Sequence, residues 1–134
     1  MAAETEGVVP LRSEADIVAS RQVVRQLCVG LKFSLVDQTK MITAASELSR
    51  NTLVHGGGGQ MRWRVVEEGL KRGLRLSFED QGPGIPDQAL ALTDGWTSGG
   101  GMGLGLPGSK RLVHDFELRS APGEGTCVTI TRWK

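Results

Sequence analysis

The sequence predicts an α/β fold of the two-layer α+β type, in which one mixed, largely antiparallel β-sheet carries three helices on one face. Two observations point to it. Strand-like alternation occurs in hairpin pairs, which excludes a regular parallel α/β sheet, and three segments have the apolar spacing of helices. The chain has 134 residues, of which 39% are hydrophobic, enough for one core. No internal repeat or linker indicates a second domain, so we expect residues 1–134 to form one domain.

The first half of the chain predicts an edge strand at 8–12 and two helices. Ser13 is a suitable N-cap for a helix over 13–29, and Asp37 is the expected cap of a second helix that ends before the four glycines 56–59. Those glycines are either a floppy linker or a turn that must clear a ligand or partner. The expected apolar stripes are Ile17, Val18, Val24, Leu27 and Cys28 in the first helix, and Met41, Ile42, Ala45, Leu48, Thr52 and Val54 in the second.

The second half begins with two alternating segments, 60–67 and 74–79, which predict an antiparallel hairpin with its turn at 68–73. Later segments are then expected in this order: a short helix at 86–92, an aperiodic loop at 93–101, a helix at 102–115 and strands at 116–120 and 126–133.

Composition limits the possible partners and compartments. The net charge is +1 with no basic cluster, so we expect no nucleic-acid partner. No apolar run approaches the roughly 20 residues of a membrane span, and the N-terminus does not resemble a signal peptide, so we expect a cytoplasmic protein without a membrane partner. Cys28 and Cys127 both lie in apolar patterns, which favours buried thiols over a disulfide.

Three stretches carry the residues suited to chemistry. Glu47, Asn51 and His55 are spaced by four, which predicts a polar row beside the apolar stripe of the second helix. Alone, such a row is more typical of a solvated helix face. Asp80, however, is followed by spaced glycines, and a second glycine run at 99–108 opens a helix, where bare backbone N–H groups bind phosphate. Together the three stretches indicate a nucleotide site.

The second glycine run also matches a dinucleotide-binding fingerprint, Gly103-x-Gly105-x-x-Gly108. That motif requires a strand leading directly into the loop. Here a flexible segment, 97–101, precedes it, so we reject this interpretation. The sequence also lacks a Walker loop.

Taken in chain order, the three stretches resemble the ATP site of the GHKL superfamily, which includes gyrase, Hsp90, histidine kinase and MutL ATPases. The matching boxes are Glu47-x-x-x-Asn51, Asp80-x-Gly82-x-Gly84 and Gly101-x-Gly103-x-Gly105. Because the chain holds only such a domain, it looks most like the small serine kinases of bacterial partner-switching modules, in particular the RsbT-type switch kinases of the stressosome. The similarity extends from about residue 8 to 133.

The resemblance implies a role for each box. Asp80 would accept a hydrogen bond from the adenine amino group with Thr126 beside it, Asn51 would bind Mg²⁺, and Glu47 would orient or deprotonate an attacking hydroxyl. His55 would either line the phosphate end or merely cap the helix, and Arg50 could touch phosphate or a partner. Gly82 and Gly84 would let the backbone pass close to the base. The phosphates would be wrapped by Gly101, Met102, Gly103, Leu104 and Gly105, and residues 93–103 would be the lid.

The function that the resemblance implies is that of a protein serine/threonine kinase using ATP and Mg²⁺. Its substrate would be a STAS-domain antagonist protein, and after release it would activate a PP2C-type phosphatase, possibly within a large stressosome assembly. Two alternatives stay open. One is an anti-sigma factor of the same fold that sequesters a sigma factor, and the other is a catalytically idle ATP-binding adaptor.

Overall fold

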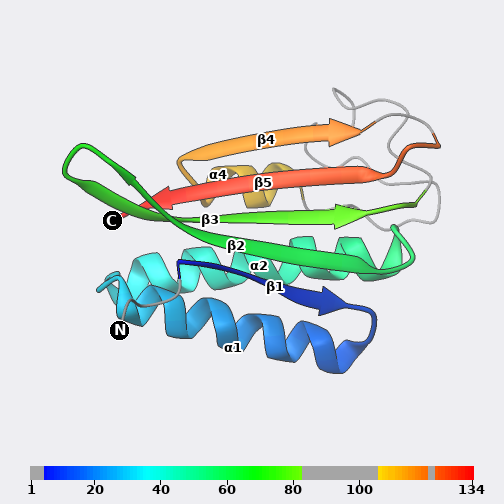
Figure 1. Ribbon diagram of the computed structural model, residues 1–134, viewed down its shortest axis with the longest axis horizontal. Helices are drawn as coiled ribbons and strands as arrows, with labels where there is room; N and C mark the ends of the chain where they lie inside the picture. The colour runs from blue at the N-terminus through cyan, green and yellow to red at the C-terminus, as the bar shows by residue number, and fades with distance from the viewer. Residues whose placement is uncertain (1–4, 83–105, 121–122) are drawn as a thin grey trace.

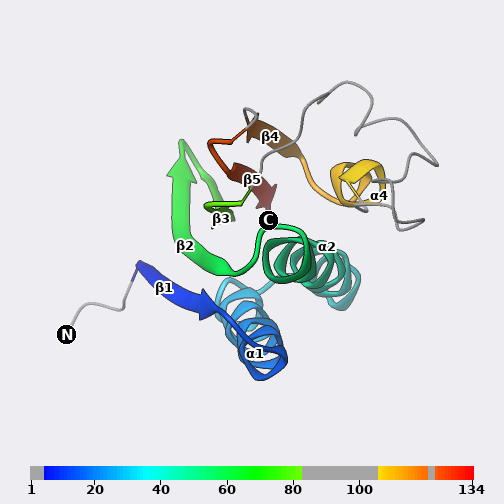
Figure 2. The ribbon, with the colours of Figure 1, turned by 90° about the vertical axis from the view of Figure 1, so that its right-hand side faces the viewer.

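A computed structural model describes residues 5–82, 106–120 and 123–134. Five strands form one sheet in the order β1-β2-β3-β5-β4, and every described strand pair is antiparallel. The three described helices lie on one side of this sheet (Figures 1 and 2), which confirms the predicted architecture. The elements are β1 (Glu6–Leu11), α1 (Glu14–Gly30), α2 (Leu35–Val54), β2 (Gly59–Glu68), β3 (Lys71–Asp80), α4 (Leu106–Arg111), β4 (Asp115–Ser120) and β5 (Thr126–Trp133).

Serine hydroxyls cap both long helices. Ser13 accepts a hydrogen bond from the backbone N–H of Asp16 at 3.3 Å, as predicted for the start of α1. In α2 the prediction of Asp37 as the cap was wrong, because Ser34 takes that position and accepts from the Asp37 N–H at 3.1 Å. Asp37 instead lies in the first turn, where the helix dipole also favours a carboxylate. The cap of α2 therefore lies three positions earlier in the chain than predicted.

The β2–β3 turn is tighter than predicted. The strands run to Glu68 and from Lys71, so the expected turn at 68–73 shrinks to two residues. Gly69 has φ +61°, a conformation that glycine adopts without strain. Gly73 lies within β3, where a Cβ would come 2.7 Å from the Arg132 carbonyl oxygen. The glycines thus mark one turn and one close strand contact.

The last helix is shorter at its C-terminal end than the predicted 102–115. α4 ends at Arg111, where the Leu112 N–H bonds to the Ser109 carbonyl. The His114 N–H then donates to the Thr131 carbonyl at 3.0 Å, so the chain already pairs with β5. The helix and loop predicted at 86–92 and 93–101 lie outside the described residues.

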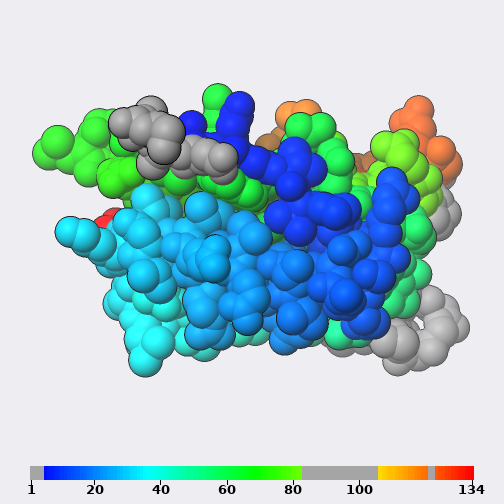
Figure 3. Space-filling model, turned by 60° about the horizontal axis from the view of Figure 1, so that its bottom comes forward, coloured from blue at the N-terminus to red at the C-terminus, as the bar shows by residue number. Residues whose placement is uncertain are grey.

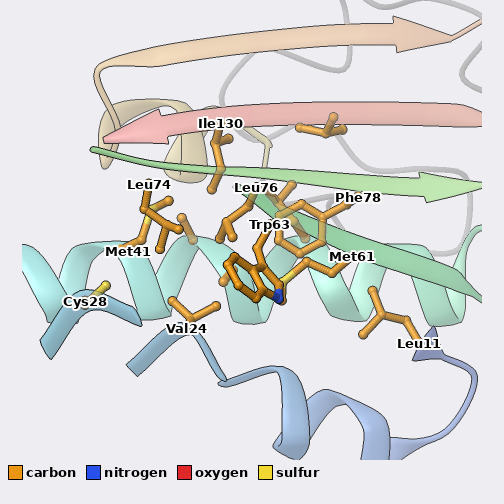
Figure 4. Close-up of a cluster of buried hydrophobic side chains, with 14 of the residues drawn as sticks. Leu11, Val24, Cys28, Met41, Met61, Trp63, Leu74, Leu76, Phe78 and Ile130 are labelled. Atoms are coloured by element: carbon orange, nitrogen blue, oxygen red, sulfur yellow. The ribbon is translucent and has the colours of Figure 1, made fainter. Parts of the chain in front are cut away.

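The core fills the space between the sheet and the helices (Figure 4). Trp63, Leu76 and Phe78 project from β2 and β3 toward α1 and α2, where buried side chains such as Met41 meet them. The predicted inward residues Val18 and Val54 were wrong, since each is 51% exposed. No helix among the described residues combines the length and hydropathy needed to span a membrane.

A half-buried cation joins β5 to α2 and to the segment after α4, at the end of the sheet opposite Asp80. The guanidinium of Arg132, in β5, pairs with Asp37 of α2 at 2.5 Å and donates to the Leu112 carbonyl after α4 at 2.8 Å. The side chains of Arg132 and Asp37 are 11% and 28% exposed. Nearby Cys28 is a free buried thiol whose pKa is raised to about 12 by burial, which confirms the expected buried thiol. The second thiol, Cys127, is free but only half-buried.

Candidate functional site

A pocket opens between the C-terminal end of α2 and the ends of β3 and β5. It brings together four of the predicted site residues, Asn51, His55, Asp80 and Thr126, from three elements that are distant in the sequence. Apolar side chains make up much of its wall, as a flat aromatic ligand requires. The full lining is Leu48, Asn51, Thr52, His55, Gly56, Phe78, Asp80, Leu106, Thr126 and Val128.

Asp80 is the charged group of this pocket. It ends β3, with Thr126 opposite on β5 and Gly59 opposite on β2. Its Oδ1 accepts a hydrogen bond from the Gly82 N–H at 2.9 Å. Burial raises the pKa of the Asp80 carboxyl, while hydrogen bonds from the Gly82 and Thr126 backbones act in the opposite direction. A half-buried carboxylate among apolar walls is suited to accept a hydrogen bond from one amino group of a ring.

Glycines surround Asp80 so closely that side chains would displace it. A Cβ at position 56 would lie 2.4 Å from the Asp80 Cγ, and one at position 125 would lie 2.2 Å from the Asp80 carbonyl oxygen. A Cβ on Gly82 would lie 2.8 Å from the Gly56 Cα. The sequence reading missed Gly56 and Gly125 as site residues. The sequence carried a signal for Gly56, which lies in the run of four glycines. For Gly125 the only signal was its place in a turn.

The run of four glycines is a tight turn, so the floppy-linker interpretation was wrong. Gly57 and Gly58 have φ of +76° and +103°, values that other residues rarely adopt. At Gly59 a Cβ would lie only 1.9 Å from the Glu79 carbonyl oxygen. The turn therefore lets β2 pass close to β3 and leaves room for Asp80, and it is not a floppy linker.

Only part of the polar row of α2 reaches the pocket. Four residues advance a helix by about 40° beyond a full turn, so side chains spaced by four drift around its surface. Asn51 and His55 line the pocket, whereas Glu47 is exposed and is not part of its lining. His55 fits both earlier interpretations, because it is the C-cap of α2 and also a pocket residue.

The other predicted site residues are placed as follows. Arg50 forms an exposed ion pair with Glu14 of α1 at 3.4 Å. Gly82 contacts Asp80 and Gly56 without lining the pocket. Within 5–82, 106–120 and 123–134, no group of three His, Cys, Asp or Glu residues could hold a metal ion. The remaining predicted phosphate-loop and base-loop residues, Gly84, Gly101, Met102, Gly103, Leu104 and Gly105, lie outside the described residues.

Comparison with known families decides which nucleotide-binding class this pocket belongs to. A family model described as histidine kinase-, DNA gyrase B- and HSP90-like ATPase matches residues 36–134. The chain belongs to this ATPase family. The match contains α2, β3 and β5, the elements that form the pocket, and confirms the GHKL resemblance seen in the sequence boxes.

Two relatives within this GHKL family indicate which kind of ATPase-fold protein the chain is. The chain is 44% identical over 128 residues to a serine/threonine-protein kinase, RsbT of Bacillus subtilis, with 96% of each chain covered. It is 25% identical to an anti-sigma F factor from a Thermoanaerobacter species, covering 85% of this chain and 82% of that one. The chain is therefore a kinase-type enzyme that uses ATP, as predicted.

A solved structure supports the fold independently. A chain in the crystal structure of the SiaB–SiaC complex from Pseudomonas aeruginosa superposes with a TM-score of 0.55 at 12% identity, covering 96% of this chain and 89% of that chain. At this identity the likeness concerns the fold alone.

Replacing Asp80 by Asn should weaken ATP binding by about tenfold or more, because a hydrogen bond to a charged acceptor contributes roughly 1.5–3 kcal/mol. The variant should fold normally, since Asn keeps the shape of the side chain. Calorimetry with ATP and with GTP, which lacks the adenine amino group, measures the effect. An unchanged ATP affinity would remove Asp80 from the base-binding site.

Gly56→Ala should weaken ATP binding severalfold, because the added Cβ must push the Asp80 carboxylate from its position. Gly30→Ala is the matched control, since position 30 has open space and lies at the far end of α1. In an Asp80→Asn background, Gly56→Ala should have little further effect on ATP affinity, because the carboxylate is already lost. Equal losses in both backgrounds would mean that Gly56 acts on the pocket as a whole rather than through Asp80.

Proposed function

We propose that this protein is a protein serine/threonine kinase that uses ATP and Mg²⁺ to phosphorylate a STAS-domain antagonist. Once released, it would activate a PP2C-type phosphatase in a bacterial partner-switching pathway of sigma-factor regulation. The observation that carries the proposal is the 44% identity, over 96% of both chains, to a serine/threonine-protein kinase. The pocket supports it, because Asp80 and its apolar walls suit an adenine ring.

Asn51 is the residue that fits a cation role. It lies on the pocket wall and offers an amide oxygen, the type of ligand that Mg²⁺ prefers. Protein sites commonly hold this ion through one or two side chains, with phosphates and water completing the shell. Mg²⁺, when bound, supplies charge neutralisation on the phosphates of ATP. Asn51 would hold the ion, and His55, four residues further along α2, would line the phosphate end.

Phosphorylation explains how such a kinase would release its substrate. A phosphate adds about −1.5 to −2 charges to the acceptor protein. Close to Glu47 and to the phosphates of the nucleotide, that charge is repelled. The proposed kinase therefore binds the unmodified STAS protein tightly and its phosphorylated form weakly, which frees it for a second partner.

The second candidate function is an anti-sigma factor, favoured by the 25% identity to anti-sigma F factors. Both functions share the ATP pocket, so only the partners separate them. The purified protein should be mixed with ATP labelled on the γ-phosphate, a STAS protein and a PP2C-type phosphatase, and separately with a sigma factor. The control is the STAS protein with its acceptor serine changed to alanine.

Label on the STAS serine together with stimulation of the phosphatase is the expected result. Stable binding to the sigma factor without phosphatase activation would instead establish the anti-sigma function. ATP binding with neither transfer nor sigma-factor binding would leave the idle adaptor, the third possibility raised by the sequence.

A further inference from the structure

A groove lies on the face of the sheet that the described helices leave uncovered (Figure 2). Residues of β1, β2 and β3 line it, and its volume is about 490 Å³. On the helix side α1 forms much of the surface (Figure 3), and the nucleotide pocket opens there among core-facing residues such as Phe78. Side chains alternate along a strand, so the polar residues of the groove point the other way. The groove is therefore separate from the nucleotide pocket.

The register of the strands gathers three arginines in this groove. Arg64 of β2 lies directly opposite Arg75 of β3, and Arg62 lies two positions before Arg64, on the same face of β2. Like charges directly opposite one another on neighbouring strands destabilise a sheet. The sequence predicted no basic cluster, because strand pairing and not chain order brings Arg75 to Arg64. Sheet stability does not explain this arrangement.

Neighbouring acids do not balance these arginines. Arg62 pairs with Glu79 at 2.5 Å. The Arg64 Nε lies 3.7 Å from the Glu6 Oε2 of β1, and because their side chains are 66% and 70% exposed, this pair contributes little. In the part of the chain that the structure describes, Arg75 forms no ion pair. A half-buried guanidinium at the groove is thus left without a counter-charge.

The Arg75 side chain is also held in position. Its Nε–H donates to the Thr131 hydroxyl oxygen at 2.9 Å, and Thr131 is only 1% exposed, so the anchor is fixed in the sheet. The two Nη groups carry four further N–H donors in the plane of the guanidinium. A guanidinium that is already oriented loses little freedom when it binds a pair of oxygens. Arg75 is therefore suited to receive an oxyanion.

We propose that this groove binds a small phosphate monoester, with the phosphate between Arg64 and Arg75. A phosphate monoester carries about −1.5 to −2 charges and three acceptor oxygens, so it can bridge two guanidiniums. A carboxylate has two oxygens and matches a single guanidinium fork. The groove volume lies in the range of small-molecule pockets, roughly 300–1,000 Å³, so there is room for an organic group. Val8, which is 51% exposed at the groove, provides an apolar contact for that group.

This site does not depend on the proposed kinase function, because it lies on the other face of the sheet. Strand β3 connects the two places, since it carries Arg75 toward the groove and Asp80 toward the nucleotide pocket. A ligand in the groove would leave the nucleotide pocket open. We therefore expect the two sites to be occupied at the same time.

The test titrates the protein with phenyl phosphate, and with benzoate as the carboxylate of the same ring. NMR of the ¹⁵N-labelled protein follows the arginine Nε–H signals, and those of Arg64 and Arg75 should shift with phenyl phosphate. Arg75→Gln should weaken its binding roughly tenfold, because a hydrogen bond from a charged donor is lost. The matched control is Arg119→Gln, which removes an exposed arginine of β4 outside the groove and should leave the affinity unchanged.

Arg64→Gln provides a second test that does not disturb the Arg75 anchor. Without ligand this variant should melt at the same temperature as the unchanged protein or slightly higher, because the opposed like charges are gone. It should also bind phenyl phosphate severalfold more weakly. A clear loss of thermal stability would mean that the arginine pair serves the fold, and would overturn the proposal.

Three further results would contradict the phosphate site. The first is benzoate binding as tightly as phenyl phosphate, and the second is an equal loss of affinity in Arg119→Gln. The third is displacement of phenyl phosphate by saturating ATP, which would place the probe in the nucleotide pocket. Binding that persists with ATP present and depends on both Arg64 and Arg75 would establish the groove as a second ligand site.

Discussion

Glu47→Ala should reduce phosphate transfer by about a hundredfold, the lower range for loss of a general base, and should leave ATP affinity nearly unchanged. The reason is its position. Glu47 is exposed on α2 and does not line the pocket, whereas Asn51, one turn later, does. The measurement pairs single-turnover transfer to the acceptor protein with ATP binding by calorimetry.

Another exposed acid provides the control for this prediction. Glu67→Ala removes a carboxylate from β2, at the far end of the sheet from Asp80, and should change neither quantity. Transfer by Glu47→Ala at the rate of the unchanged protein would show that Glu47 is not the base. A parallel loss of ATP affinity would place Glu47 in nucleotide binding instead.

Arg132→Ala should lower the free energy of unfolding by about 2 kcal/mol, because it removes the hydrogen bonds that a charged donor makes to Asp37 and to the Leu112 carbonyl. The Arg132 side chain is 11% exposed, and its guanidinium holds both Asp37 and the Leu112 carbonyl. Urea unfolding followed by circular dichroism measures the change. Arg119→Ala, which removes an exposed ion pair with Glu117, should cost well under about 1 kcal/mol.

The effect of Arg132→Ala should shrink in acid. The hydrogen bond from Arg132 lowers the pKa of the Asp37 carboxyl. A lowered folded-state pKa gives stability that is fully present above the unfolded pKa, about 4, and is lost as the pH falls through the folded value. The gap between the two proteins should therefore narrow below about pH 4. A gap of constant size down to pH 2 would show that the charge of Asp37 contributes little.

Local chemistry made most of the fold predictable from the sequence. Alternation in 60–67 and 74–79 identified the β2–β3 hairpin, because one face of those strands is buried and the other is not. Ends of elements were less predictable. Ser34 and Asp37 are both good residues for a helix start, and only the backbone hydrogen bond shows which one caps α2.

The site was predictable in its residue types and less so in its geometry. Asp80 and Thr126 were placed together by resemblance to the family, and their strands do pair at that point. The four-residue spacing suggested that Glu47 and Asn51 share one face, but only Asn51 lines the pocket. The role of Gly56 could not be read from the sequence, because it depends on a contact with a residue 24 positions later.

The end of β3 and the start of α4 both lie at the pocket. Gly82 touches Asp80 and Gly56, and Leu106 lines the pocket, so both described residues that flank 83–105 lie at the nucleotide site. A connection whose flanking residues lie at one location can change in length at little cost in loop-closure entropy. Evolution could therefore lengthen or shorten the chain between Gly82 and Leu106 while the sheet and the pocket remain the same.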